Sequence, residues 1–383
     1  MAEPTPAVRV STLELFFDLV FVFTITQLAA TLAEDLSVGT LGDVMLILFV
    51  VWWMYSGYAW LTNAVAPNST TRRTLLLTGM AGFLVMALAV PEAFDDYGWL
   101  FGVSYLVVNL VHGALFRTAG PGAREAQRLL GPLNVVAALL VLAGGLVPEP
   151  WRHLLWLAAP LLQIVTGYLL RVEMFTIQAG HFVERHGLVV IIAIGESIIA
   201  IGAGIEGMEL GSGEILVAVL GLWVAYYLWW LYFAGDDARA ERVLAGTDDP
   251  RRRARLALNG WGYAHYVILL GIVVAAVGVK KTAGHAFEGL HWNEATTLAG
   301  GVALYMVGHA AFLALLRLRG VYHRLAGAAV VLATIPLGHQ LAVAQLGAIA
   351  IIMTATAIVE DVPEIRRSGT TAISDFGRTG HHD

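Results

Sequence analysis

Two carboxylates stand four residues apart in an otherwise apolar stretch near the start of the chain. Glu14 and Asp18 belong to the run Glu-Leu-Phe-Phe-Asp-Leu-Val-Phe, and in a helix this spacing places both on one face. Two ionised carboxylates that lie close in a low dielectric repel each other, so one should hold a proton unless a basic residue pairs with them. Arg171 or Arg185 could supply that pairing. The pattern therefore predicts either a proton or cation site or a structural ion pair that locks helices together.

A second group of ionisable residues surrounds another apolar run. His181, Glu184 and Arg185 precede it, and Glu196, followed by Ser197, interrupts it near its middle. A charge near the bilayer centre costs about 2.5–3.5 kcal/mol on insertion scales, so a residue retained there predicts a function. Glu196 is for this reason the strongest single candidate in the chain.

The same histidines and carboxylates allow a metal site as an alternative. His181 and Glu184 stand three positions apart (i, i+3) and could share a metal ion. His186, however, points elsewhere on a helix, and the motif has no second copy, so a polar bracing or gating cluster is favoured and no cofactor is predicted. Three further histidines lie inside apolar segments, where they can shuttle protons or pack as neutral side chains: His112, His265 and His309.

The composition says which solvent surrounds these residues. Of the 383 residues, 58% are hydrophobic and only 14% are charged, whereas a globular protein carries about 25% charged residues. The mean hydropathy is +0.71. Such a chain cannot cover itself with a polar surface, so it must lie largely in lipid. The absence of cysteine excludes disulfides and thiolate metal sites, and the net charge of −6 excludes a basic surface for nucleic acid.

Runs of about 20 apolar residues are needed to cross a bilayer as helices. The sequence contains twelve, near 10–33, 41–62, 73–91, 98–117, 129–147, 151–172, 186–206, 213–235, 259–280, 295–317, 321–338 and 341–359. The fold class predicted is therefore an all-α polytopic membrane protein.

Basic residues predict the direction of the spans, because positively charged loops stay in the cytoplasm. With the N-terminus inside, 20 of the 23 Lys and Arg residues fall on cytoplasmic segments. Both ends are then cytoplasmic. We expect no removable signal peptide at the start, and a flexible cytoplasmic tail at 361–383.

The two halves of the chain resemble each other, which predicts a repeat of six helices at 1–177 and 178–360. Six matches occur in the same order, among them the Trp-Trp-x-Tyr motif at 52–55 and 229–232, Asn109 with His309, Arg128 with Arg324, and Glu173 with Glu360. Because six is even, both copies enter the membrane in the same direction, as parallel repeats do in many transporters. A pathway would then lie between the halves; the alternative is a duplicated scaffold without one.

Two motifs carry a family resemblance. The residues 14–23, together with His181-Phe182, Glu184-Arg185, Gly187-Leu188 and Gly195-Glu196-Ser197, resemble the bacterial low-temperature-requirement A (LtrA) family over nearly the whole chain. The resemblance implies a multi-pass protein of the bacterial cytoplasmic membrane that is linked to growth in the cold. It assigns no catalytic or binding role to any residue.

The first span also resembles, more distantly, the pore-lining first helix of the endolysosomal and bacterial potassium channels built from six-helix repeats. The similarity rests on the run from Phe16 to Phe21, with Asp18 at its centre. Phe17 stands where those channels have serine, and the seventh span has no matching Phe-x-Asp.

Three functions are compatible with these features. A secondary transporter or channel-like protein would use the buried carboxylates for proton or cation coupling. A membrane-embedded enzyme would act on a lipid-linked substrate, although no nucleophile or Walker motif is recognisable. A structural or sensory protein would act through the arginine-rich loop 236–255 and the tail. We favour transport, with membrane lipids and a small ion or small molecule as partners, and a homo-oligomer as a possible assembly. The candidate site residues are Glu14, Asp18, His181, Glu184, Arg185, Glu196, Ser197 and His309.

Overall fold

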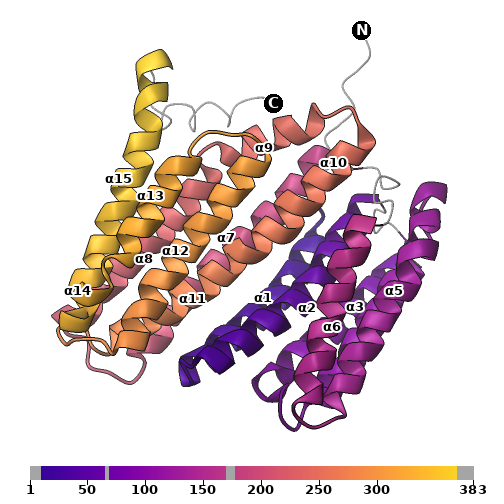
Figure 1. Ribbon diagram of the computed structural model, residues 1–383, viewed down its shortest axis with the longest axis horizontal. Helices are drawn as coiled ribbons and strands as arrows, with labels where there is room; N and C mark the ends of the chain where they lie inside the picture. Colours follow the sequence, from indigo (N-terminus) through magenta and orange to yellow (C-terminus); the bar gives the residue numbers. More distant parts are fainter. Residues whose placement is uncertain (1–9, 65–68, 170–176, 369–383) are drawn as a thin grey trace. The chain divides into compact units, whose positions relative to one another are not determined.

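The computed structural model describes residues 10–64, 69–169 and 177–368 of the chain, and this part is helical without strands (Figure 1). It forms two compact units. The first contains the described residues up to Ala193 together with Glu241–Tyr266, and the second contains Ile194–Ala240 together with the residues from Val267 onward.

The first unit is made of the helices that begin the chain. They are α1 (Thr12–Glu34), α2 (Val38–Ala64), α3 (Thr70–Ala89) with the short η1 (Val90–Glu92), α4 (Gly98–Phe116), α5 (Pro121–Gly145), α6 (Trp151–Leu169) and the start of α7 (Ala179–Ile205). Part of α9 (Asp236–Ala245), all of α10 (Pro250–Ala257), the π-helix η3 (Leu258–Ala264) and the first residues of α11 (His265–Ala283) complete it.

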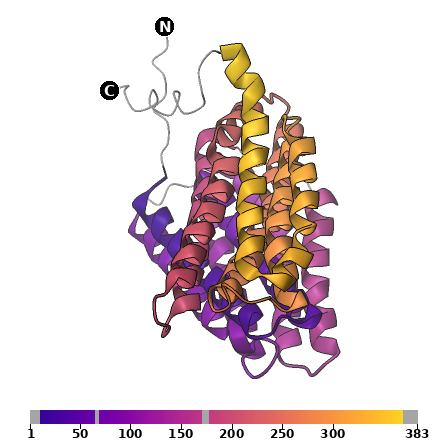
Figure 2. The same ribbon diagram turned by 90° about the vertical axis from the view of Figure 1, so that its left-hand side faces the viewer.

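The second unit holds the remainder of α7, α9 and α11. Its other helices are α8 (Ser212–Phe233), α12 (Trp292–Leu315), α13 (Val321–Leu332), α14 (Ile335–Gln340) and α15 (Ala342–Ser368). Within this unit α15 packs beside α8 and α13, and its end extends past the end of α13 (Figures 1 and 2).

Eleven segments of the described chain are long and apolar enough to cross a membrane. They correspond to eleven of the twelve predicted spans. The sixth span is present as α6, but this helix carries Arg152, His153 and Gln163 and is not among the eleven. The chain is therefore an all-helical multi-pass membrane protein, as its composition predicts. The direction of the spans and the six-helix repeat stay predictions.

Two segments that we expected to be irregular are helical. The predicted loop 236–255 contains α9 and most of α10, because its arginines and alanines are good helix formers and Asp249 caps α10 by accepting from the Arg251 N–H. The predicted tail 361–383 begins inside α15, which continues to Ser368. Residues 369–383 lie outside the described part.

Small residues let the helices of the first unit approach closely. A Cβ added at Gly102 would lie 2.5 Å from the backbone of Leu142, and one added at Gly145 would lie 2.1 Å from Gly98. Such close backbone approach is typical of helix packing in membranes. It holds α4 against α5 and leaves α1, α2 and the start of α7 to enclose the polar site.

Candidate functional site

The N-terminus of α1 positions the first carboxylate of the site. Ser11 caps the helix: its hydroxyl accepts from the Glu14 N–H at 3.4 Å, and Glu14 Oε2 accepts from the Ser11 N–H at 2.8 Å. This reciprocal pair is a capping box. It fixes the Glu14 side chain at the start of the helix and leaves its other oxygen, Oε1, to face α7.

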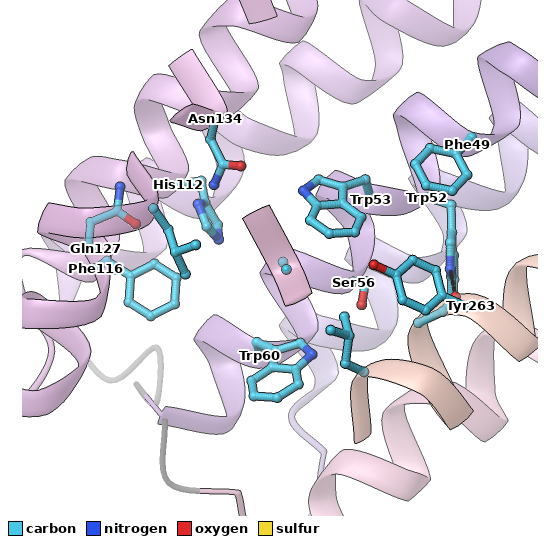
Figure 3. Close-up of a pocket in the computed structure, with 15 residues that line it drawn as sticks. Phe49, Trp52, Trp53, Ser56, Trp60, His112, Phe116, Gln127, Asn134 and Tyr263 are labelled. Atoms are coloured by element: carbon cyan, nitrogen blue, oxygen red, sulfur yellow. Dashed lines mark hydrogen bonds between the residues drawn. The ribbon is translucent and has the colours of Figure 1, made fainter. Parts of the chain in front are cut away.

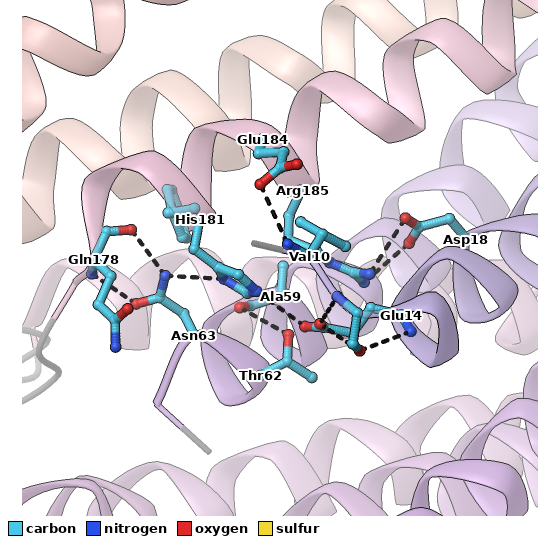
Figure 4. Close-up of polar contacts among 12 residues, drawn as sticks. Val10, Glu14, Asp18, Ala59, Thr62, Asn63, Gln178, His181, Glu184 and Arg185 are labelled. Atoms are coloured by element: carbon cyan, nitrogen blue, oxygen red, sulfur yellow. Dashed lines mark hydrogen bonds and ion pairs between the residues drawn. The ribbon is translucent and has the colours of Figure 1, made fainter. Parts of the chain in front are cut away.

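Glu14 Oε1 lies 3.2 Å from Nε2 of His181, and both side chains are buried. The Asn63 amide nitrogen, a donor, lies 3.4 Å from His181 Nδ1 and also donates to the Gln178 carbonyl at 3.0 Å. Since Nδ1 accepts from Asn63, the ring proton of the neutral imidazole belongs on Nε2, where it faces Glu14. Figure 4 shows this chain of contacts from α2 through α7 to α1.

One turn further along α1, Asp18 forms the most buried contact of the site. Its two oxygens lie 2.9 and 3.2 Å from the two terminal nitrogens of Arg185, and Oδ1 also accepts from the Tyr55 hydroxyl at 2.8 Å. Asp18 is 0% and Arg185 1% exposed. The Arg185 guanidinium also lies 6.0 Å from the ring centre of Phe17 and 5.8 Å from that of Tyr55, within cation–π range.

These four ionisable side chains, Glu14, Asp18, His181 and Arg185, are here called the charge cluster. Its geometry matches the ion pairing with Arg185 that the sequence allowed as the locking alternative. A bidentate carboxylate–guanidinium pair is strongly directional, so it holds α1 and α7 in register. The Glu14–His181 contact differs in kind, since an imidazole has a neutral and a protonated form, whereas a guanidinium keeps its charge.

The other predicted site residues lie apart from the charge cluster. Glu184 is exposed, and one of its oxygens accepts from the Val10 N–H at 3.3 Å. Glu196 and Ser197 are buried and lie further along α7, in the second unit. His309 lies in the same unit, on α12.

A second buried ionic group in the second unit was not predicted. Arg324 on α13 contacts Asp236 and Glu360, each at 2.8 Å, and donates to the Leu231 carbonyl at 2.8 Å. His309 Nε2 lies 4.0 Å from Asp236. The repeat offered a signal, because it matches both Arg324 and Glu360 to residues of the first half, but it gave no indication of their proximity.

The remaining intramembrane histidines pack against aromatic rings or donate hydrogen bonds to nearby backbone carbonyls. His186 Nδ1 and His265 Nδ1 each lie 2.8 Å from a backbone carbonyl, of Phe182 and Gly260 respectively. Within the described residues, no three His, Asp or Glu side chains gather closely enough to hold a metal ion.

An aromatic cavity lies in the first unit, between α2, α4, α5, α6 and η3 (Figure 3). Its volume is about 100 Å³. The aromatic lining residues are Phe49, Trp52, Trp53, Trp60, Phe116 and Tyr263, and the polar ones are Ser56, His112, Gln127 and Asn134. Trp52 connects the cavity to the charge cluster, since its indole stacks on the Tyr55 ring at 5.3 Å and Tyr55 donates to Asp18.

Comparison with known proteins places this chain. Residues 9–359 match the family model of the bacterial low temperature requirement A protein (LtrA). The chain belongs to the LtrA family. It is also similar to an uncharacterized protein, RA0937, of Rhizobium meliloti (strain 1021), with 30% identity over 320 residues that cover 80% of this chain and 77% of the relative.

The two motifs that carry the LtrA resemblance in the sequence meet in the structure. The motif of α1 supplies Glu14 and Asp18, and the motif that begins α7 supplies His181 and Arg185. Glu184, Glu196 and Ser197 of the second motif fall outside the charge cluster. In this LtrA protein the residues most specific to the resemblance are therefore also those that contact one another within the first unit.

Proposed function

We propose that this LtrA protein is a transport protein of the bacterial cytoplasmic membrane, a secondary transporter or channel-like protein, that couples movement of a small ion or molecule to protonation of the charge cluster. The observation that carries the proposal is the burial of Glu14, Asp18, His181 and Arg185, each no more than 5% exposed, in helices able to cross a membrane. An ionisable group inside a transmembrane segment is by default a candidate for an ion or proton pathway.

The two pairs have different roles in this proposal. Asp18 is compensated by a guanidinium that stays charged at any physiological pH, so this pair anchors α7 to α1. The Glu14–His181 pair exchanges the proton. Adding a proton to Nδ1 of His181 removes the acceptor that faces Asn63, and adding one to Glu14 removes the negative charge that holds the imidazole. The first event loosens the contact between α2 and α7, and the second loosens the contact between α1 and α7.

The aromatic cavity gives this coupling a place for cargo. Trp52 lines the cavity and stacks on Tyr55, whose hydroxyl is bonded to Asp18. A change in the charge cluster therefore reaches the cavity wall through two side chains in direct contact.

A structural or sensory role is the second candidate, and the bidentate Asp18–Arg185 pair favours it. A buried ion pair with fixed geometry can specify how two helices pack without taking part in transport. In that case the loss of either partner would lower stability and leave transport unaffected.

The test is flux in proteoliposomes driven by a proton or potassium gradient. Glu14→Gln is the sharpest variant, because glutamine keeps the capping box with Ser11 but removes the charge that faces His181. We expect at least a tenfold loss of proton-driven flux. Glu125→Gln, on the exposed surface of α5, is the matched control and should behave as the wild type.

Asp18→Asn and Glu196→Gln extend the same experiment. Unchanged flux in Glu14→Gln, Asp18→Asn and Glu196→Gln, with reduced thermal stability, would assign these carboxylates to structure and overturn the transport proposal. Absence of flux in the wild type under both gradients would do the same.

A further inference from the structure

The aromatic cavity has the size and wall chemistry of a binding site for a small molecule. Its volume of about 100 Å³ is close to that of engineered protein cavities of about 150 Å³ that bind benzene. Trp52, Trp53 and Tyr263 line it from α2 and η3 (Figure 3). Indole and phenol faces favour stacked or edge-on contact with a flat ring, so the walls suit a single aromatic ring.

The lining also contains polar atoms without a partner. Nε2 of His112 and the hydroxyl of Tyr263 have no hydrogen-bond partner among the described residues, and His112 is only 5% exposed. A buried polar atom left unpaired is unfavourable, because it has lost its hydrogen bonds to water without replacing them. A ligand that brings a hydroxyl or amine to these atoms recovers that cost, whereas a pure hydrocarbon does not.

The residues that line the cavity also determine which charge a ligand can carry. None of the described residues that line the cavity is an Asp, Glu, Lys or Arg. A charged ligand would lose its hydration without gaining a counter-ion, which is strongly unfavourable. The ligand should therefore be uncharged.

The backbone beside the cavity has an unusual form. Leu258, Gly262 and Tyr263 of the lining all belong to the π-helix η3, and the Gly262 carbonyl accepts from the Trp52 indole at 2.6 Å. Single π-helical turns inside α-helices occur frequently at functional sites. On α6, Gly167 keeps the wall open, since an added Cβ would contact Tyr263 and Trp53 at 3.3 and 3.4 Å.

We propose that the first unit binds an uncharged molecule with one aromatic ring and a hydrogen-bonding substituent, of the phenol or aniline class, in this cavity. The proposal deepens the transport function, on which it rests for the role of this molecule as cargo. Binding itself can be measured without transport, so the failure of one is distinguishable from the failure of the other.

The probe is 4-fluorophenol, and its binding to the purified full chain in lipid nanodiscs is followed by ¹⁹F NMR. We expect saturable binding that weakens at least tenfold in Gly167→Leu, whose side chain fills the cavity, and in Trp53→Ala. Trp230→Ala is the matched control, because Trp230 occupies the corresponding place in the second Trp-Trp-x-Tyr motif. This variant should bind as the wild type does.

The requirement for a hydrogen-bonding substituent on the ligand is tested by comparing the binding of 4-fluorophenol with that of fluorobenzene. The wild type should prefer 4-fluorophenol by about fivefold to tenfold, as one neutral hydrogen bond allows. Tyr263→Phe or His112→Leu should reduce that preference. Because there are two separate variants, the test still holds if one of them fails to fold.

Three results would overturn the proposal. Non-saturable uptake, or uptake that Gly167→Leu leaves unchanged, would mean partitioning into lipid. Tighter binding of phenyltrimethylammonium than of 4-fluorophenol would mean a cation cage. If 4-fluorophenol binds as expected but is not transported, the binding site stands and only its role as cargo falls.

Discussion

Asp18 and Arg185 each offset the free-energy cost of burying the charge of the other. Their contact is bidentate, and Tyr55 supplies a further donor to the carboxylate. Breaking such a buried pair by removing one partner costs far more than the pair contributes relative to two apolar residues, because the partner left behind keeps its charge. The consequence is a strong and measurable coupling between two residues that are distant in the sequence.

Arg185→Gln is expected to lower the free energy of unfolding by about 3–5 kcal/mol, because Asp18 then stays buried without a cation. Asp18→Asn should cost a comparable amount for the opposite reason. The double variant should cost clearly less than the sum of the two single ones. Reversible unfolding of the purified protein in mixed micelles, followed by circular dichroism, measures all three. Additive losses would contradict the pairing.

Outside the membrane helices, Asp35 gives a dependence on pH. The hydroxyls of Thr40 and Ser37 donate to its carboxylate and lower the pKa of Asp35. A lowered pKa in the folded state stabilises the protein above the unfolded value of about 4 and loses that effect as the pH falls through the folded value. The stability difference between the wild type and Asp35→Asn should therefore be present at neutral pH and shrink in acid. A difference that grows below pH 4 would contradict this assignment.

Among the elements, α11 and α12 are held together by glycines that admit backbone contact. A Cβ at Gly301 would lie 2.2 Å from the Ala275 nitrogen, and one at Gly278 would lie 2.3 Å from the Leu298 Cα. Helices in lipid gain little from hydrophobic burial and depend on such close packing. Of two adjacent glycines on one helix, one can therefore lie in such a backbone contact while the other lies outside it.

Gly301→Ala should destabilise the protein, by about 1–3 kcal/mol, because the helices must separate to admit the methyl group. Gly300→Ala is the control: an added Cβ there meets nothing within 4 Å, and alanine favours the helix by up to about 1 kcal/mol. Thermal unfolding of both variants in the same detergent makes the comparison. Equal effects would contradict the packing described.

Arg324 joins three helices, whereas its match in the first half of the sequence does not. Arg324→Ala leaves Glu360 without its cation and Asp236 with Arg239 alone, and should cost about 3–5 kcal/mol. Arg128 is exposed and forms no ion pair with another described residue, so Arg128→Ala should change stability by less than about 0.5 kcal/mol. Unfolding of the two variants, measured under the same conditions, compares these two losses of stability. A large loss in Arg128→Ala would instead point to a partner beyond the described chain.

The sequence predicts the helices well and their contacts poorly, for physical reasons. Apolar runs of about 20 residues leave the backbone no alternative to a helix in lipid, so even α6 lies where its pattern placed it. Arg185 was one of two basic partners considered for Asp18, because a carboxylate placed in an apolar span needs a cation; the other, Arg171, lies outside the described residues. The contact of Arg324 with Asp236 and the π-helix at Tyr263 were not predicted, because neither leaves a periodic pattern in the residue types.

At the scale of the whole chain, the compact units do not follow the boundaries of the predicted repeat. The first unit includes the start of α7 and the segment Glu241–Tyr266, both from the half at 178–360. A compact unit consists of helices that pack together, whereas a repeat consists of segments that are similar in sequence. A helix can therefore belong to one copy of the repeat and pack with the other copy. The repeat and the direction of the spans therefore need a test that does not depend on packing.

The absence of cysteine makes that test direct. If the basic segments lie in the cytoplasm, Asp248→Cys, between α9 and α10, should react with a membrane-impermeant maleimide only in inside-out vesicles. Glu209→Cys, between α7 and α8, should react only in intact cells. Both positions are exposed, so access depends on the side of the membrane rather than on burial. Because α8 is a single span separating them, the reversed pattern of labelling would contradict the predicted direction, and labelling of both from the same side would contradict α8 as a membrane span.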